Sequence, residues 1–140
     1  MSVTRIANKL ITQYFLIVML AGCAATGPTV CKDGEVSASI ENNGSKFCKV
    51  TLIFTSTYGV TEYPGVEATF FDASGNTIGS STYFFDAILP GKSQRKASML
   101  ECNGQSIKSM QIVSAVHRNL CYRGRCAPIC GVDGKTLTWE

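Results

Sequence analysis

The sequence predicts an all-β protein, in which an antiparallel β-sandwich follows an N-terminal signal-peptide helix and precedes a cysteine-rich tail. Apolar and polar residues alternate with a period of two through the middle of the chain, which is typical of half-buried strands. Turn sequences separate these stretches at intervals of roughly ten residues, the spacing expected of a sandwich. After the signal segment, no window of the sequence has a helical period or helix caps. We therefore expect two packed sheets.

The expected strands follow a turn at 31–34. In the first of them, Val36, Ala38 and Ile40 alternate with polar residues, and the later strands repeat this pattern. The expected strands cover residues 36–41, 50–55, 66–71, 77–85, 94–101 and 110–117. Gly, Asn and Asp predict the turns between them, because these residues adopt turn conformations readily. The turns are expected at 42–45, 72–76, 89–92 and 102–104.

Two stretches within this body resemble a known family. Residues 68–79 (ATFFDASGNTIG) and 89–93 (LPGKS) are similar to the FxLYD type of immunoglobulin-like domain. That family has an aromatic–aspartate strand end, a D-x-x-G hairpin, an apolar–glycine pair and a Pro-Gly turn. Ala68 stands where the family prefers Phe, and the cysteines are not part of its pattern. The resemblance covers about residues 35–100 and implies an immunoglobulin-like sandwich, which is a fold and not yet a function.

The first 22 residues have the parts of a secretory signal. Arg5 and Lys9 precede an apolar run at 14–21, which is too short to span a bilayer. The run ends in Leu20-Ala21-Gly22-Cys23, which matches the lipobox of bacterial lipoproteins. The resemblance implies a diacylglycerol on the Cys23 thiol, cleavage between Gly22 and Cys23, and acylation of the new amino group. The alternative is an ordinary signal peptide cleaved after Ala24 or Ala25.

The lipobox implies a membrane anchor at the start of the exported chain. One acyl chain binds a membrane only marginally, so a stable anchor needs more than one. In enteric lipoproteins Asp after the lipidated cysteine holds the protein in the inner membrane. Ala24 stands there in this chain, so we expect the outer membrane. The expected organisation is a signal peptide (1–22), a lipidated tether (23–33), an immunoglobulin-like sandwich (34–117) and a Cys-rich tail (118–140).

Without residues 1–22, the 140-residue chain keeps 118 residues, enough for one domain. These carry 11 basic and 10 acidic residues with no basic stripe, so nucleic acid is not an expected partner. We instead expect a protein partner in the cell envelope and no cofactor.

Six cysteines follow Cys23, and an exported chain meets an oxidising compartment. They are Cys31, Cys48, Cys102, Cys121, Cys126 and Cys130. The even number fits three disulfides, with 15 pairings open. The last three cannot all pair among themselves, so at least one bridge is expected to tie the tail to the sandwich.

The alternative, a zinc site, lacks a second close Cys pair and has only His117 as a histidine, so we expect no metal. We expect reduction to release the tail before the sandwich unfolds.

The tail contains a second resemblance. Residues 128–136 (PICGVDGKT) are similar to the centre of Kazal-type protease inhibitors, which implies inhibition as an alternative function. Only three residues separate Cys126 from Cys130, where that family needs a longer reactive loop. The other interpretation is a turn closed by a disulfide.

Nothing in the sequence forms a recognisable catalytic set. There is no G-x-S-x-G elbow, no paired carboxylates and no Gly-rich phosphate loop. His117 is interpreted as a strand-end residue without a carboxylate neighbour.

The aromatic residues are expected mainly in the core and at its rim, with a contact surface as the alternative: Tyr58, Tyr63, Tyr83, Phe84 and Phe85. Arg118, Arg123 and Arg125 are expected on a solvated face, with contact to acidic lipid headgroups or polymers as the alternative. The leading hypothesis is a non-enzymatic interaction or structural module, and an enzyme with an unrecognised site is the last alternative.

Overall fold

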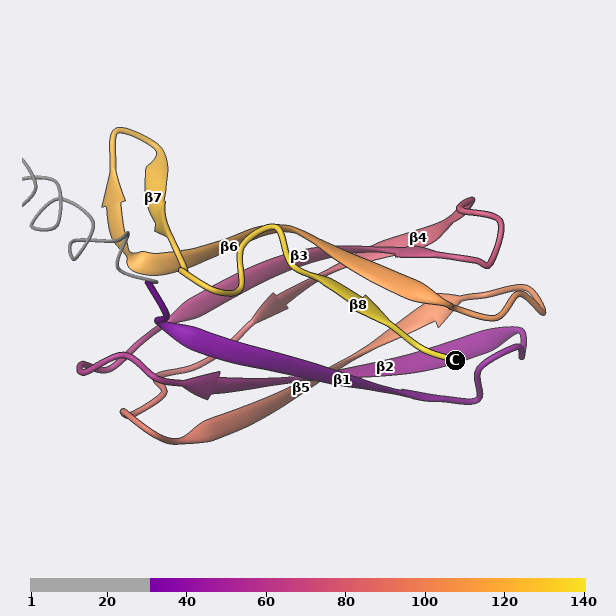
Figure 1. Cartoon of the computed structure of the whole chain (residues 1–140), viewed down its shortest axis with the longest axis horizontal. Helices are drawn as coiled ribbons and strands as arrows, with labels where there is room; N and C mark the ends of the chain where they lie inside the picture. The colour runs from indigo at the N-terminus through magenta and orange to yellow at the C-terminus, as the bar shows by residue number, and fades with distance from the viewer. Residues whose placement is uncertain (1–30) are drawn as a thin grey trace, which may run out of the picture. The chain divides into compact units, whose positions relative to one another are not determined.

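The computed structural model describes residues 31–140. The expected signal peptide, the lipidation at Cys23 and the cleavage between Gly22 and Cys23 lie outside the described residues. Eight strands form two sheets packed face to face (Figure 1). They are β1 (Gly34–Glu41), β2 (Phe47–Ser56), β3 (Pro64–Phe71), β4 (Thr77–Phe84), β5 (Ser93–Glu101), β6 (Ser109–Tyr122), β7 (Arg125–Pro128) and β8 (Thr136–Thr138). Within residues 31–140, no helix is long and apolar enough to cross a bilayer.

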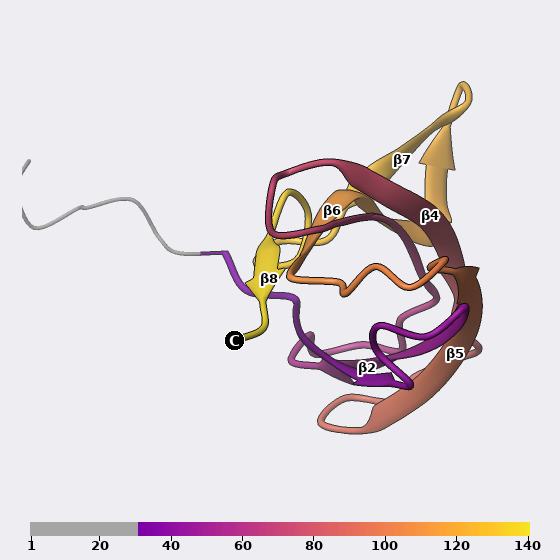
Figure 2. The ribbon, with the colours of Figure 1, turned by 90° about the vertical axis from the view of Figure 1, so that its right-hand side faces the viewer.

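The strand order is that of an immunoglobulin-like sandwich. One sheet has the order β1-β2-β5, and the other has the order β4-β3-β6-β7, with β8 also paired to β6. All pairings are antiparallel. Seen along its length, the molecule has the two sheets as opposed layers (Figure 2). The prediction of an all-β antiparallel sandwich is confirmed, and each of the six expected strands is present.

The tail differs from the expectation, because it supplies two further strands. β6 continues past residue 117 to Tyr122. Its final part pairs with β7 and its first part with β8, so these two strands share one edge of the sheet and residues 129–135 interrupt it. Strands of four and three residues are too short to produce a visible alternation in the sequence. The tail is therefore part of the sandwich.

The core lies between the two sheets and receives residues from almost every strand. Phe54 of β2 and Phe85 after β4 meet there, with ring centroids 5.7 Å apart. The tail contributes Ile129 and Val132, both fully buried. Among the described residues, both sheets and the core belong to one compact unit, Cys31–Glu140.

Gly34, at the start of β1, is expected to tolerate no side chain. It is buried, and a Cβ added there would collide with the ring tip of Phe54. Overpacking a core of this kind costs about 1–3 kcal/mol. Gly34→Ala should therefore lower the urea midpoint of unfolding, whereas Gly59→Ala, with nothing within 4 Å of the added carbon, should not. Equal midpoints for the two variants would contradict this packing.

Candidate functional site

The six cysteines form three disulfides: Cys31–Cys130, Cys48–Cys102 and Cys121–Cys126. The first joins the tail to the entry of the domain, so the expectation of at least one such bridge is confirmed. The second is buried in the core, and the third closes the hairpin between β6 and β7. Cys31, Asp33 and Cys130 are also close enough together to suggest a metal site. Because both sulfurs are joined in a disulfide, they are not available as metal ligands.

Four segments far apart in the sequence meet at the end of the sandwich where the described chain begins. We call this the Cys31 end, and it comprises residues 31–34, 56–64, 84–92 and 117–128 (Figure 1, left). Strand pairing brings them together, since Gly34 pairs with Ser56 and Pro64 with His117. Backbone hydrogen bonds complete the end, from Phe85 to Pro64 and from Ser56 to Lys92.

A buried polar cluster lies inside the Cys31 end. His117 is 3% exposed and Glu62 is 1% exposed. Nε2 of His117 lies 3.2 Å from Oδ2 of Asp33, and its Nδ1 lies 3.6 Å from Oε1 of Glu62. Asp33 Oδ2 also accepts a hydrogen bond from the backbone N–H of Cys130. The cluster therefore ties the entry segment, the loop before β3, the strand β6 and the tail together.

The interpretation of His117 as a strand-end residue without carboxylate neighbours is wrong in both parts, because β6 continues to Tyr122 and two carboxylates face the imidazole. Asp33 and Glu62 come from loops 84 and 55 positions away, and folding alone brings them to the imidazole. A single acidic residue in a loop usually lies in solvent, so no pattern in the sequence pointed to the burial of Glu62. Ser56, Glu62 and His117 are all buried in the described structure.

Burial raises the pKa of the Glu62 carboxyl above its ordinary value. The nearby Ser56 hydroxyl and His117 favour the ionised form and oppose this effect, whereas the charge of Asp33 adds to it. Neither Glu62 oxygen has a hydrogen-bond partner within the described residues. The desolvation of the carboxylate is thus only partly compensated.

Glu62→Gln is expected to flatten the pH dependence of stability. With a raised pKa, the folded state binds more protons than the unfolded state above about pH 4.5, so stability falls as pH rises toward the raised pKa. The slope is at most about 1.4 kcal/mol per pH unit. Urea unfolding of both proteins from pH 4.5 to 7 measures the difference. Glu67→Gln, at an exposed position of β3, is the control and should follow the wild type.

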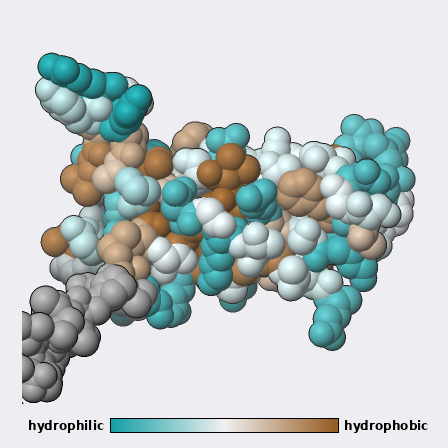
Figure 3. Space-filling model, turned by 45° about the horizontal axis from the view of Figure 1, so that its top comes forward, coloured by the Kyte–Doolittle hydropathy of each residue, from teal (hydrophilic) through white to brown (hydrophobic). Residues whose placement is uncertain are grey.

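Part of the Cys31 end is exposed and apolar. Of the five aromatic residues singled out in the sequence, Tyr83 and Phe85 are in the core, whereas the other three are exposed. The exposed large apolar side chains of this end are Tyr58, Val60, Tyr63, Phe84, Leu89, Leu120 and Tyr122. In the space-filling view, apolar surface lies at the base of the projecting β6–β7 hairpin, whose tip is hydrophilic (Figure 3).

The Kazal-like residues serve the fold. Ile129 and Val132 are buried, and Cys130 is bonded to Cys31. The carboxylate of Asp133 accepts a hydrogen bond of 2.8 Å from the backbone N–H of Ala115. The segment thus forms a turn packed against β6, with its central side chains directed into the protein.

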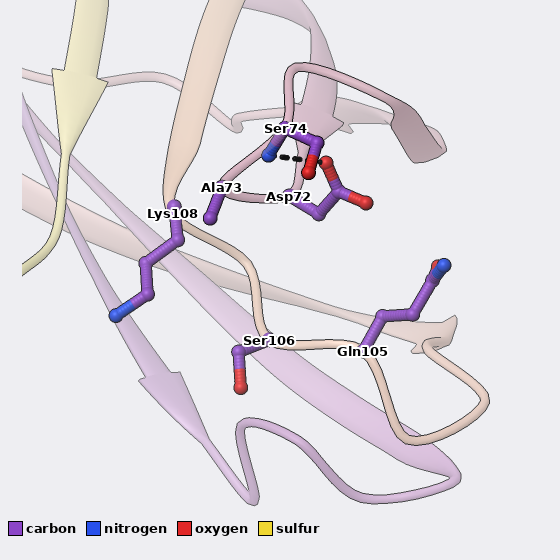
Figure 4. A pocket seen from close by; sticks show the side chains of 6 residues that line it. All are labelled: Asp72, Ala73, Ser74, Gln105, Ser106 and Lys108. Atoms are coloured by element: carbon purple, nitrogen blue, oxygen red, sulfur yellow. Dashed lines mark hydrogen bonds between the residues drawn. The ribbon is translucent and has the colours of Figure 1, made fainter.

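A shallow polar hollow of about 230 Å³ lies at the opposite end of the sandwich (Figure 4). It is lined by Asp72, Ala73, Ser74, Gln105, Ser106 and Lys108. Asp72 accepts hydrogen bonds from the backbone N–H groups of Ser74 and Asn76, so its carboxylate is used in the turn. The side chains of Gln105 and Lys108 point in different directions. The hollow therefore lacks convergent polar groups.

Comparisons with known proteins assign this chain to no family. No family model and no curated protein matches the sequence. Among solved structures, it is similar to a β-glucuronidase from glycoside hydrolase family 2, with 13% identity and a TM-score of 0.46. That match covers 77% of this chain and 11% of the glucuronidase. A Northeast Structural Genomics Consortium target is similar at 13% identity and a TM-score of 0.44, covering 76% of this chain and 85% of the target.

Proposed function

We propose that this protein is a bacterial lipoprotein, held in the cell envelope by lipid on Cys23, with the sandwich as a non-enzymatic interaction or structural module. The observation that carries the proposal is the lipobox Leu20-Ala21-Gly22-Cys23 behind a short apolar run. The three disulfides support it, because such bonds form in oxidising compartments and are rare in the cytosol. The two observations are independent, since the cysteines of the disulfides lie downstream of the lipobox.

The sandwich fits a module that binds or spaces rather than one that catalyses. The residues nearest to a catalytic set, Ser56, His117 and Glu62, are all buried. The Kazal-like segment is used as a packed turn, so no observation favours the inhibitor alternative. An envelope protein remains the proposed partner of the module.

Mass spectrometry of the N-terminal peptide tests the anchor. The exported protein should begin at Cys23 and carry a diacylglycerol and an amide-linked acyl chain. Cys23→Ser should abolish the modification and move the protein to the soluble fraction, whereas Thr26→Ser should leave both unchanged. An unmodified peptide that begins at Ala25 or Thr26 would refute the anchor and support ordinary signal cleavage.

Membrane fractionation tests the destination. With Ala24 after the lipidated cysteine, the protein should be found with the outer membrane of a two-membrane cell. Ala24→Asp should retain it in the inner membrane. Recovery of both proteins in the same fraction would contradict the proposed sorting without affecting the lipid itself.

A further inference from the structure

The hairpin between β6 and β7 projects from the sandwich and is joined to it at its base, where the backbone N–H of Arg118 bonds to the carbonyl of Tyr63. Every residue from 118 to 125 is exposed. The two-residue turn at its tip, Arg123-Gly124, has positive φ at both positions, as tight hairpins require. The Cys121–Cys126 disulfide holds the two arms together in place of a core. In two perpendicular views the hairpin extends beyond both sheets (Figures 1 and 2).

The hairpin has the composition of a segment that contacts a lipid headgroup region. Residues 118–128 include three arginines and no acidic residue. Leu120 is 48% exposed and Tyr122 is 72% exposed, so an apolar and an aromatic side chain accompany the charge. Tyrosine is enriched at membrane–water interfaces, and arginine is attracted to anionic lipids. Arg118 is partly used within the fold, since it donates to the carbonyl of Phe85, whereas Arg123 stacks on the ring of Tyr122 at the tip.

The hairpin also lies at the end of the domain that is nearest to the proposed anchor. Cys31 is bonded to Cys130, which follows β7 by two residues. Seven residues separate Cys23 from Cys31, and the eight Cα-to-Cα steps between the two cysteines span at most about 29 Å when fully extended. A lipid on Cys23 would therefore keep the Cys31 end close to the bilayer surface.

Acidic groups at the Cys31 end do not cancel the charge of the hairpin. Glu62 is buried, and Asp33 faces His117. Glu35 and Asp86 are paired with Lys32 and Lys96, respectively. Arg123 and Arg125 thus present their charge outward.

We propose that the β6–β7 hairpin docks on the surface of the bilayer that holds the anchor, with Arg123 and Arg125 on anionic phospholipid headgroups and Leu120 and Tyr122 in the interfacial layer. The location of this bilayer rests on the proposed function. The docked hairpin orients the sandwich, so that its opposite end faces away from the membrane.

Vesicle flotation of residues 24–140, exported behind an ordinary signal peptide and therefore without lipid, tests the docking. The domain should co-float with phosphatidylglycerol-containing vesicles at low salt and not with phosphatidylcholine vesicles. An arginine near an anionic surface contributes about fivefold to the partition coefficient, so Arg123→Gln with Arg125→Gln should lower it about 25-fold. Raising the salt to about 0.5 M should have a similar effect, because it shortens the screening length.

Lys46→Gln with Lys108→Gln is the matched control, since it removes two charges at the opposite end of the domain. It should retain most of the binding. Equal losses in the two double variants would overturn the proposal, because attraction would then come from net charge alone. Absence of co-flotation of the wild type at low salt would also overturn the proposal. The hairpin would then be assigned to binding a protein instead of lipid.

A fluorescence measurement locates the contact independently. Tyr122→Trp in a Trp139→Phe background should shift its emission to the blue when phosphatidylglycerol vesicles are added, and an unchanged spectrum would contradict insertion. Both experiments omit the lipid on Cys23. A negative result in these two experiments would not change the result expected from mass spectrometry of the N-terminal peptide. The docking proposal and the lipid-anchor proposal can therefore be refuted separately.

Discussion

Replacing Cys31 and Cys130 together by serine is expected to lower the free energy of unfolding of the domain by about 4–5 kcal/mol. The bridge joins positions 99 residues apart, and closing a loop of that length restricts the unfolded chain strongly. A small domain has only about 5–15 kcal/mol of net stability, so the variant should be partly unfolded near 37 °C. Both cysteines are replaced because a single remaining thiol would exchange with the other disulfides.

Guanidinium unfolding of the exported domain, followed by circular dichroism, measures this effect. Cys121→Ser with Cys126→Ser is the matched control, since its bridge spans only five positions and should contribute about 2 kcal/mol. One cooperative transition is expected in each variant, because β7 and β8 are paired to β6 and the core includes Ile129 and Val132. An early separate transition would instead support the expectation that reduction releases the tail first.

Phe54→Ala is expected to cost about 3–5 kcal/mol, the range for removing a buried aromatic ring. Phe54 is a fully buried residue of β2, the central strand of the three-stranded sheet. Its ring packs against Phe85 and lies over Gly34. Its removal leaves a cavity that neighbours held in both sheets cannot fill.

Thermal and urea unfolding check this cost. Phe47→Ala removes the same group from the same strand, but Phe47 is 49% exposed and should lose less than about 1 kcal/mol. Similar losses in the two variants would show that the ring of Phe54 is not the central packing element.

The body of the fold could be predicted from the sequence because its strands are half-buried. In β2, for example, Val50, Leu52 and Phe54 face the core while their neighbours are more exposed, and this contrast is visible as alternation. The turns could be predicted for a similar reason, because their residue types are chosen locally. Gly75, for example, has a φ of 81°, a conformation that favours glycine.

The features that could not be predicted depend on contacts between distant segments. β7 and β8 are held by their register on β6, which the sequence of the tail does not reveal. Likewise, Glu62 and Asp33 gain their role only when folding places them beside His117. The three hairpin arginines were visible, but their projection from the sandwich was not.

The Cys31–Cys130 disulfide also determines how the domain bears mechanical load. With the proposed lipid anchor on Cys23, a pull on the tether would enter the domain at Cys31, just before β1. The disulfide passes part of that pull to Cys130, which lies between β7 and β8 at the edge of the opposite sheet. Tension is thus divided between both sheets at the point of entry. When a partner is held at the far end of the domain, the force would act on the whole sandwich instead of detaching β1 first.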